Sequence, residues 1–216
     1  MITFLKFAKF ISFPFHKTLY WVKVEGKENI PKDKGFILCS NHISYIEPVL
    51  IVLYFKKPVH FMGKAEIFGK NKIFDAFLRG VNVFPVERGS GGAEAIEFAS
   101  KLIADGKAVG IFPEGTRSKD GVPMRAKSGA ALLTNMTGAD VLPMAVVIKG
   151  KMRPFKRIRI IVGELIPNSQ LAFEETDRKG LRRASTLIMG RITELWKKGQ
   201  GLAQETGDRD QETGDL

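Results

Sequence analysis

The sequence predicts an α/β fold: a single domain in which a central, mostly parallel or mixed sheet is flanked by helices. Short apolar runs with strand character alternate with longer helical patterns along the chain, which is typical of this class. The 216 residues are enough for one substantial core. The single cysteine, Cys39, lies in an apolar run, which indicates a small buried residue and excludes a disulfide framework or a cysteine-rich zinc site.

Seven segments are predicted as strands because they are short, apolar or alternating, and end at turn or loop signals. In chain order they are 21–26, 36–40, 59–64, 81–88, 108–112, 141–149 and 157–165. The fourth contains Pro85, which cannot donate a hydrogen bond to a neighbouring strand. We therefore expect this strand at an edge of the sheet or at a bulge.

Helices are predicted between and after these strands, at 48–55, 66–80, 91–107, 127–139 and 177–198. The second of them contains a glycine and reads as one or two short helices. The third has the clearest amphipathic pattern, and Gly106 marks its end. Its apolar stripe consists of Ala95, Ile96, Ala99, Leu102 and Ile103.

The two ends of the chain differ from the predicted domain at 21–200. Residues 1–20 place Lys6, Lys9 and Lys17 on one side of a helix and apolar residues over most of the rest, which predicts a helix in a membrane interface. The segment is too short and too charged to span a bilayer and lacks a signal cleavage site. A core helix capped by surface lysines is the alternative. The acidic residues 201–216 repeat QETGD and are predicted to be disordered.

The net charge of +11 is unevenly distributed, because the acidic tail lowers it and the rest of the chain is more basic still. Such a body indicates an anionic partner: nucleic acid, an anionic membrane or a phosphorylated substrate. A nucleic-acid-binding domain would show aromatic stacking platforms or a helix-turn-helix pattern. Here the aromatic residues cluster at the N-terminus, away from most arginines, so we expect no nucleic-acid partner.

His42 and Glu47, in the stretch NHISYIEP, allow two interpretations. Ser44 and Glu47 have the spacing of a capping box before an apolar run, which would explain Glu47 without catalysis. His42 lies on the loop before that predicted cap, and this loop can bend the imidazole back toward Glu47. A carboxylate on one ring nitrogen fixes the tautomer and leaves the other nitrogen free to take a proton.

Three further segments suit an anionic ligand. In FPEGTRS, Gly115 permits close approach of the backbone, Arg117 suits a phosphate, and Thr116 adds a donor. A simple salt bridge between Glu114 and Arg117 is the alternative there. Arg88 precedes a glycine-rich loop and a helix. Lys127 precedes the small-residue helix and would otherwise be taken as a solvated lysine.

These motifs together resemble those of the glycerolipid acyltransferases, and most closely the 1-acyl-glycerol-3-phosphate acyltransferases. The resemblance rests on NHISYIEP, GVNVFPVER, FPEGTRS and VLPMAVV in that order, and it spans about residues 21–164. FMGKAEIF and KSGAA also resemble segments between those motifs. The family pattern has an aspartate where this chain has Glu47, so the carboxylate is kept but lies one methylene further from the backbone.

The resemblance implies the fold of that family and an O-acyl transfer with no metal and no cofactor. His42 would act as the general base on the free hydroxyl of 1-acyl-sn-glycerol 3-phosphate (lysophosphatidic acid), oriented by Glu47. That hydroxyl would attack the thioester of acyl-CoA or of acyl-carrier protein, giving phosphatidic acid for phospholipid biosynthesis. The residues implied in acceptor binding are Arg88, Glu114, Gly115, Thr116, Arg117 and Lys127, and Pro143 would shape the acyl side.

The same resemblance implies a peripheral protein on the cytoplasmic face of the cell membrane, with the anionic membrane surface as a partner. Related acceptors remain open: glycerol 3-phosphate, dihydroxyacetone phosphate, another lysophospholipid or an amine-headed lysolipid. A membrane module without catalysis is a competing hypothesis, but it would have no need for His42 together with both arginine motifs.

Overall fold

The computed structural model describes residues 20–86, 93–148, 150, 153, 155–174 and 177–212, without the side chains of 93 and 202–212. Its strands are β1 (Trp21–Glu25), β2 (Phe36–Ser40), β3 (Val59–Lys64), β4 (Val83–Val86), β5 (Ala108–Ile111), β6 (Val141–Ile148) and β7 (Arg157–Val162). Its α-helices are α2 (Glu47–Tyr54), α3 (Lys72–Gly80), α4 (Ala93–Ala104), α5 (Gly129–Thr137), α6 (Asn168–Leu171) and α7 (Arg178–Glu212). Two 3₁₀ turns are η1 (Lys27–Asn29) and η2 (Ala65–Ile67).

The strands form one seven-stranded sheet in the order β1-β7-β6-β2-β5-β3-β4. Neighbouring strands are parallel, except that β6 and β7 are antiparallel. The predicted α/β domain with a mostly parallel sheet is therefore confirmed. The strand that contains Pro85 is β4, which lies at one end of the sheet as predicted.

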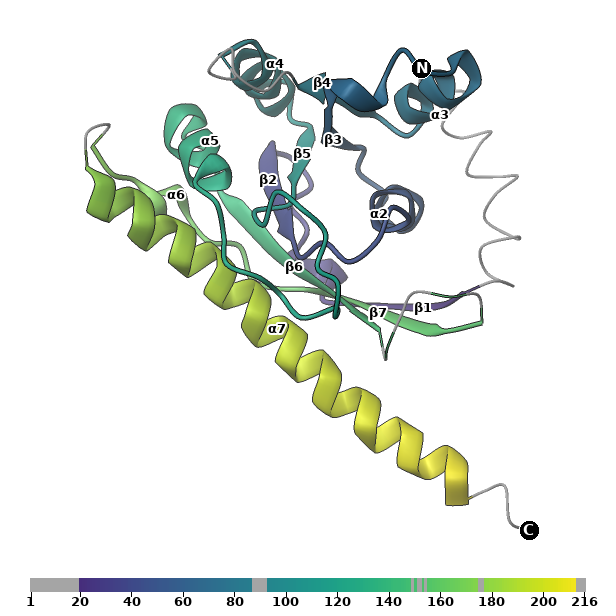
Figure 1. Ribbon diagram of the computed structural model, residues 1–216. Helices are drawn as coiled ribbons and strands as arrows, with labels where there is room; N and C mark the ends of the chain where they lie inside the picture. Colours follow the sequence, from purple (N-terminus) through teal and green to yellow (C-terminus); the bar gives the residue numbers. More distant parts are fainter. Residues whose placement is uncertain are drawn as a thin grey trace.

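Helices cover both faces of the sheet (Figure 1). The alternating side chains of β2 show the two layers: Phe36 and Leu38 pack with α2 on one face, and Ile37 and Cys39 pack with α4, α5 and α7 on the other. All five residues of β2 are buried, as expected for a central parallel strand. Cys39 is a buried free cysteine, as predicted.

The start of α2 differs from the predicted capping box. The helix begins at Glu47 with Ile46 as its N-cap residue, and Ser44 lies in the preceding turn, where its hydroxyl accepts the N–H of Ile46. Pro48 fits the first helical turn because it lacks an N–H group that would be unpaired there. The prediction that Ser44 caps the helix is wrong, but Glu47 does reach back to the Ser44 N–H at 2.9 Å.

The last helix, α7, extends past residue 200, where the predicted domain ends. The tail predicted to be disordered begins at residue 201, and α7 continues as helix to Glu212. Extending an existing helix costs far less free energy than starting a new one, and this stretch contains no proline. Figure 1 shows α7 lying across the sheet and extending beyond it.

The predicted interfacial segment at 1–20 lies outside the described residues apart from Tyr20. Within the described part of the chain, no helix combines the length and apolarity needed to cross a bilayer.

Candidate active site

The catalytic candidates meet at the carboxyl ends of two neighbouring parallel strands. His42 lies on the loop after β2, and the segment 112–118 follows β5. The two strands pair in parallel, with Cys39 opposite Ile111, so both loops leave the same edge of the sheet. Ligand sites of such sheets form at this edge.

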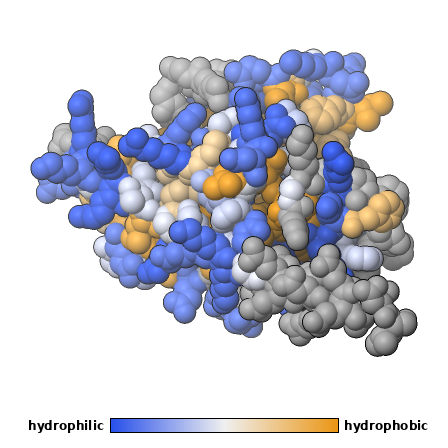
Figure 2. All heavy atoms as spheres, turned by 60° about the horizontal axis from the view of Figure 1, so that its bottom comes forward, coloured by the Kyte–Doolittle hydropathy of each residue, from blue (hydrophilic) through white to orange (hydrophobic). Residues whose placement is uncertain are grey.

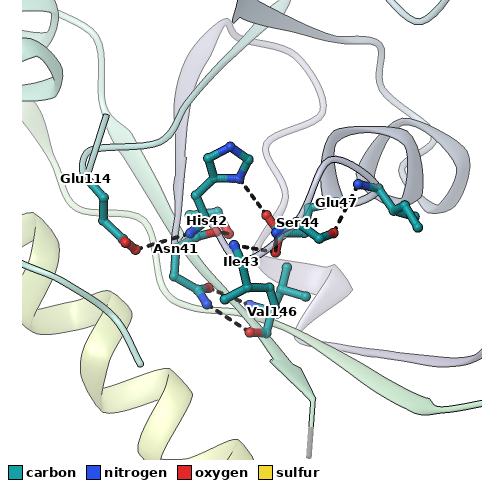
Figure 3. A network of polar contacts seen from close by, with 9 residues as sticks. Asn41, His42, Ile43, Ser44, Glu47, Glu114 and Val146 are labelled. Atoms are coloured by element: carbon teal, nitrogen blue, oxygen red, sulfur yellow. Dashed lines mark hydrogen bonds and ion pairs between the residues drawn. The ribbon is translucent and has the colours of Figure 1, made fainter. Parts of the chain in front are cut away.

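Glu47 is fully buried and contacts both the His42 ring and the loop backbone. Its Oε2 lies 2.8 Å from Nδ1 of His42. Its Oε1 accepts the backbone N–H groups of Ile43 at 2.6 Å and Ser44 at 2.9 Å. Figure 3 shows the imidazole and the loop backbone turned toward this one carboxylate. The two interpretations of Glu47 are therefore compatible, because one oxygen holds the loop and the other faces the ring.

The His42 imidazole stacks on Phe112, with ring centroids 4.1 Å apart and planes inclined by 16°. Its side chain is 18% exposed, so part of the ring remains accessible. Burial lowers the pKa of His42 to about 4; the nearby Glu114 acts against this shift and Arg117 adds to it. The ring is therefore neutral at pH 7 and can take up a proton.

Burial also raises the pKa of the Glu47 carboxyl. The N–H groups of Ile43 and Ser44 and the charge of Arg117 act in the opposite direction. An ionised Glu47 accepts all three N–H groups that converge on it, so Nδ1 of His42 carries the proton in that state. This leaves Nε2 as the ring nitrogen able to accept one.

The FPEGTRS segment holds the backbone of His42 from both sides. Oε1 of Glu114 accepts the His42 N–H at 3.1 Å, and the Ser118 N–H donates to the His42 carbonyl at 2.7 Å. Glu114 is only 2% exposed. Burial raises its pKa to about 7, against the N–H groups of His42 and Met124. The carboxyl group is thus a support beneath His42.

The remaining predicted residues of this segment face outward. Gly115 has φ +65°, and a Cβ there would lie 3.0 Å from Cδ and 3.2 Å from Nζ of Lys127. The Lys127 N–H also donates to the Pro113 carbonyl at 2.8 Å. Thr116 and Arg117 are exposed, and the Arg117 guanidinium lies 3.7 Å from the centre of the Tyr45 ring. Arg117 therefore interacts with the loop of His42, unlike in the simple salt-bridge alternative with Glu114.

The structure thus brings His42, Glu47, the 114–117 segment and Lys127 together at one edge of the sheet. Arg88 lies outside the described residues. Pro143, on β6, is opposite Cys39 of β2 and so lies beside the strand that leads into the site.

Asn41 is a structural residue that the sequence reasoning did not single out. Its fully buried amide donates to the Val146 carbonyl at 2.9 Å and accepts the Val146 N–H at 2.8 Å. It thereby ties the His42 loop to β6. Its one sequence signal was its place immediately before His42, and nothing marked Val146, 105 residues further on, as its partner.

Comparison with known proteins gives a consistent family. The family model described as "Acyltransferase" matches residues 21–147. The 1-acyl-sn-glycerol-3-phosphate acyltransferase of Bacillus subtilis is 35% identical over 188 residues, covering 82% of this chain and 89% of that protein. The protein of the same name from Borreliella burgdorferi is 31% identical over 56% of this chain and 49% of its own length.

A solved structure agrees with these relatives. The crystal structure of the 1-acyl-sn-glycerophosphate (LPA) acyltransferase PlsC from Thermotoga maritima matches with a TM-score of 0.66 at 28% identity. The match covers 88% of this chain and 78% of that one.

Proposed function

The chain belongs to the 1-acyl-sn-glycerol-3-phosphate acyltransferase family, and on this premise we propose that it transfers a fatty acyl group from a thioester donor to the free hydroxyl of lysophosphatidic acid. The reaction gives phosphatidic acid, a precursor in phospholipid biosynthesis. The observation that carries the proposal is the contact of 2.8 Å between Nδ1 of His42 and the buried Glu47 carboxyl, beside cations suited to a phosphate.

His42 is the general base of this reaction. Nε2 takes the proton of the acceptor hydroxyl as its oxygen attacks the thioester carbonyl carbon, and the charge of the imidazolium is balanced by Glu47. As the tetrahedral intermediate collapses, the C–S bond breaks and the proton passes from the imidazolium to the leaving thiolate. No acyl-enzyme forms, because the substrate hydroxyl is itself the nucleophile.

Glu47 and Glu114 position the base rather than touch the reacting atoms. Glu47 fixes the tautomer and the orientation of the ring, while Glu114 and the Ser118 N–H fix the backbone that carries it. Holding a base in place before the reaction saves the reorganisation that a mobile side chain would need. General-base assistance of this kind contributes about 10²- to 10⁴-fold.

The acceptor phosphate is bound by Arg117 and Lys127, with Arg88 as a further ligand. Arginine offers a fork of donors that suits phosphate oxygens, and Lys127 adds a point charge beside Gly115. The protein works at the surface of an anionic membrane, where its lipid acceptor resides, as a peripheral protein on the cytoplasmic side.

The test gives the purified full chain acyl-CoA or acyl-carrier protein as donor and follows release of free thiol and formation of phosphatidic acid by mass spectrometry. Lysophosphatidic acid should support turnover, and glycerol 3-phosphate and lysophosphatidylcholine should support much less. Turnover with lysophosphatidylcholine equal to that with lysophosphatidic acid would remove the phosphate-binding role of Arg117 and Lys127. No thiol release with either donor and any acceptor would refute acyl transfer.

A further inference from the structure

A groove of about 680 Å³ lies between α7 and the loop that precedes α5. The loop contributes Arg125, Ala126 and Ser128, and α7 contributes residues from Arg178 to Lys197. At 1.5 Å per residue, that part of α7 is about 28 Å long. The groove therefore has the volume of a small-molecule site and the length for an extended ligand.

The lining of the groove is basic and amphipathic. Its cations are Arg125, Arg178, Arg182 and Lys197. Glu194 is the one carboxylate among the lining residues, and it lies 3.2 Å from Arg191. Leu181, Met189 and Ala126 supply apolar surface, and serine and threonine hydroxyls from both walls add hydrogen-bonding groups. Figure 2, which turns the side of α7 toward the viewer, shows hydrophilic residues covering much of this face.

One wall of the groove is continuous with the catalytic loop. Lys127 lies between Ala126 and Ser128, its N–H donates to Pro113, and its side chain lies against Gly115. The next residue back from Gly115 is Glu114, which holds the His42 backbone. The loop that lines the groove is thus linked by these contacts to the segment that holds His42.

We propose that this groove binds the phosphorylated nucleotide end of an acyl-CoA donor, an inference that rests on the proposed acyltransferase function. Lysophosphatidic acid carries a single phosphate, which Arg117 and Lys127 take in that proposal. Acyl-CoA carries phosphates at separate points of a long molecule, together with a less polar pantetheine arm. Four cations, one on the loop and three along about 28 Å of helix, lie in the same groove as apolar lining residues and match that distribution of charge.

The test compares two double variants of the full chain that change the net charge equally. Arg182→Glu with Lys197→Glu reverses two charges that line the groove, and Lys179→Glu with Lys198→Glu reverses two exposed charges on the same helix outside it. We expect the first variant to raise KM for acyl-CoA about tenfold or more, since it removes two charge-assisted contacts to phosphate. Its kcat and its KM for lysophosphatidic acid should stay within about twofold of the parent, and the control variant should match the parent throughout.

Calorimetric titration with free coenzyme A gives a readout that needs no turnover. The parent and the control should bind it, and the groove variant should bind it about tenfold or more weakly. Equal effects of both variants, or no effect of either, would overturn the groove assignment while leaving the acyltransferase function intact. A parent that turns over only with acyl-carrier protein and does not bind coenzyme A would overturn it as well. A parent inactive with both donors contradicts the proposed function itself.

Discussion

Glu47 is the residue at which this chain departs from the family pattern, and its geometry explains how the longer side chain is accommodated. The glutamate approaches the imidazole from the first turn of α2, and its second oxygen is taken by two backbone N–H groups of the loop. The additional methylene therefore does not take the carboxylate away from His42. It places the group between the ring and the loop backbone.

Two substitutions of Glu47 distinguish the effect of its charge on catalysis from the effect of its size. Glu47→Gln should lower kcat at least about 100-fold, because an amide cannot both accept the loop N–H groups and stabilise an imidazolium. Glu47→Asp keeps the charge and should retain more activity than Glu47→Gln. Thiol-release kinetics on both variants, with unfolding midpoints measured alongside, make the comparison. A full rate in Glu47→Gln would mean that the carboxyl group serves only the turn before α2.

Glu114 gives the fold a dependence on pH. Its pKa in the folded protein is raised to about 7 from the ordinary 4.5, so the folded state holds a proton that the unfolded chain releases. The stabilisation from this group is complete below about pH 4.5 and is lost as the pH rises through 7.

Glu114→Gln should remove this dependence while an amide oxygen still accepts the His42 N–H. At pH 8 we expect the variant to be more stable than the parent by about 1–3 kcal/mol, with the difference disappearing near pH 4. Denaturant unfolding at the two pH values measures it. If the difference in unfolding free energy between variant and parent is the same at pH 4 and pH 8, the raised pKa of Glu114 is contradicted.

At the scale of elements, the loop after β5 carries two glycines whose conformations are alike but whose surroundings differ. Gly115 and Gly121 both have positive φ, at 65° and 81°. A Cβ at Gly115 would press on the Lys127 side chain, whereas a Cβ at Gly121 would have no atom of the described residues within 4 Å. Comparing substitutions at the two positions thus distinguishes the effect of backbone strain from the effect of displacing Lys127.

Gly115→Ala and Gly121→Ala should each destabilise the fold by about 1–2 kcal/mol through left-handed backbone strain. Only Gly115→Ala should raise KM for lysophosphatidic acid, by about tenfold, because it displaces Lys127, which we propose as a ligand of the phosphate. Steady-state kinetics on both variants test this. Equal KM values in the two variants would mean that Lys127 does not contribute to binding of the acceptor.

Helices and strands were predictable where the signal lies in a few neighbouring residues. Pro85 indicated an edge strand, and β4 lies at the edge. The prediction that Ser44 caps α2 was wrong. Pro48 lies in the first turn of that helix, and Glu47 accepts N–H groups of the preceding loop.

The sequence singled out candidate site residues, but the contacts that join them could not be read from it. Parallel pairing of β2 and β5 brings His42 and Glu114 together, and neither the pairing nor the burial of Glu114 can be read from spacing. The contact of Asn41 with Val146 spans 105 residues and has no local signal. Such contacts arise from the sheet order, which the sequence left open.

At the scale of the whole molecule, charge is the dominant feature. The net charge of +11 includes the acidic residues of the tail, so the rest of the chain is more basic than this total indicates. A basic body with an apolar, lysine-bearing N-terminal sequence suits an anionic membrane, where each basic residue near the surface contributes about 1 kcal/mol. A positive field of this kind also attracts phosphorylated ligands in general.

Removal of residues 1–19 should weaken binding to vesicles that contain anionic phospholipid and leave the folded domain intact. Binding by the full chain should fall as salt is raised and should be weak on vesicles of phosphatidylcholine alone. Vesicle sedimentation at two salt concentrations measures both effects. Unchanged binding after the deletion would assign the membrane contact to the domain itself.

The central claim is that His42 is the base that activates the acceptor hydroxyl. The most direct test is phosphatidic acid formation from lysophosphatidic acid and acyl-CoA, or acyl-carrier protein if that is the donor used, by His42→Ala beside the parent. We predict a loss of at least about 100-fold in kcat with the unfolding midpoint and the binding of lysophosphatidic acid nearly unchanged. A folded His42→Ala protein that forms phosphatidic acid at the parent rate would contradict the account.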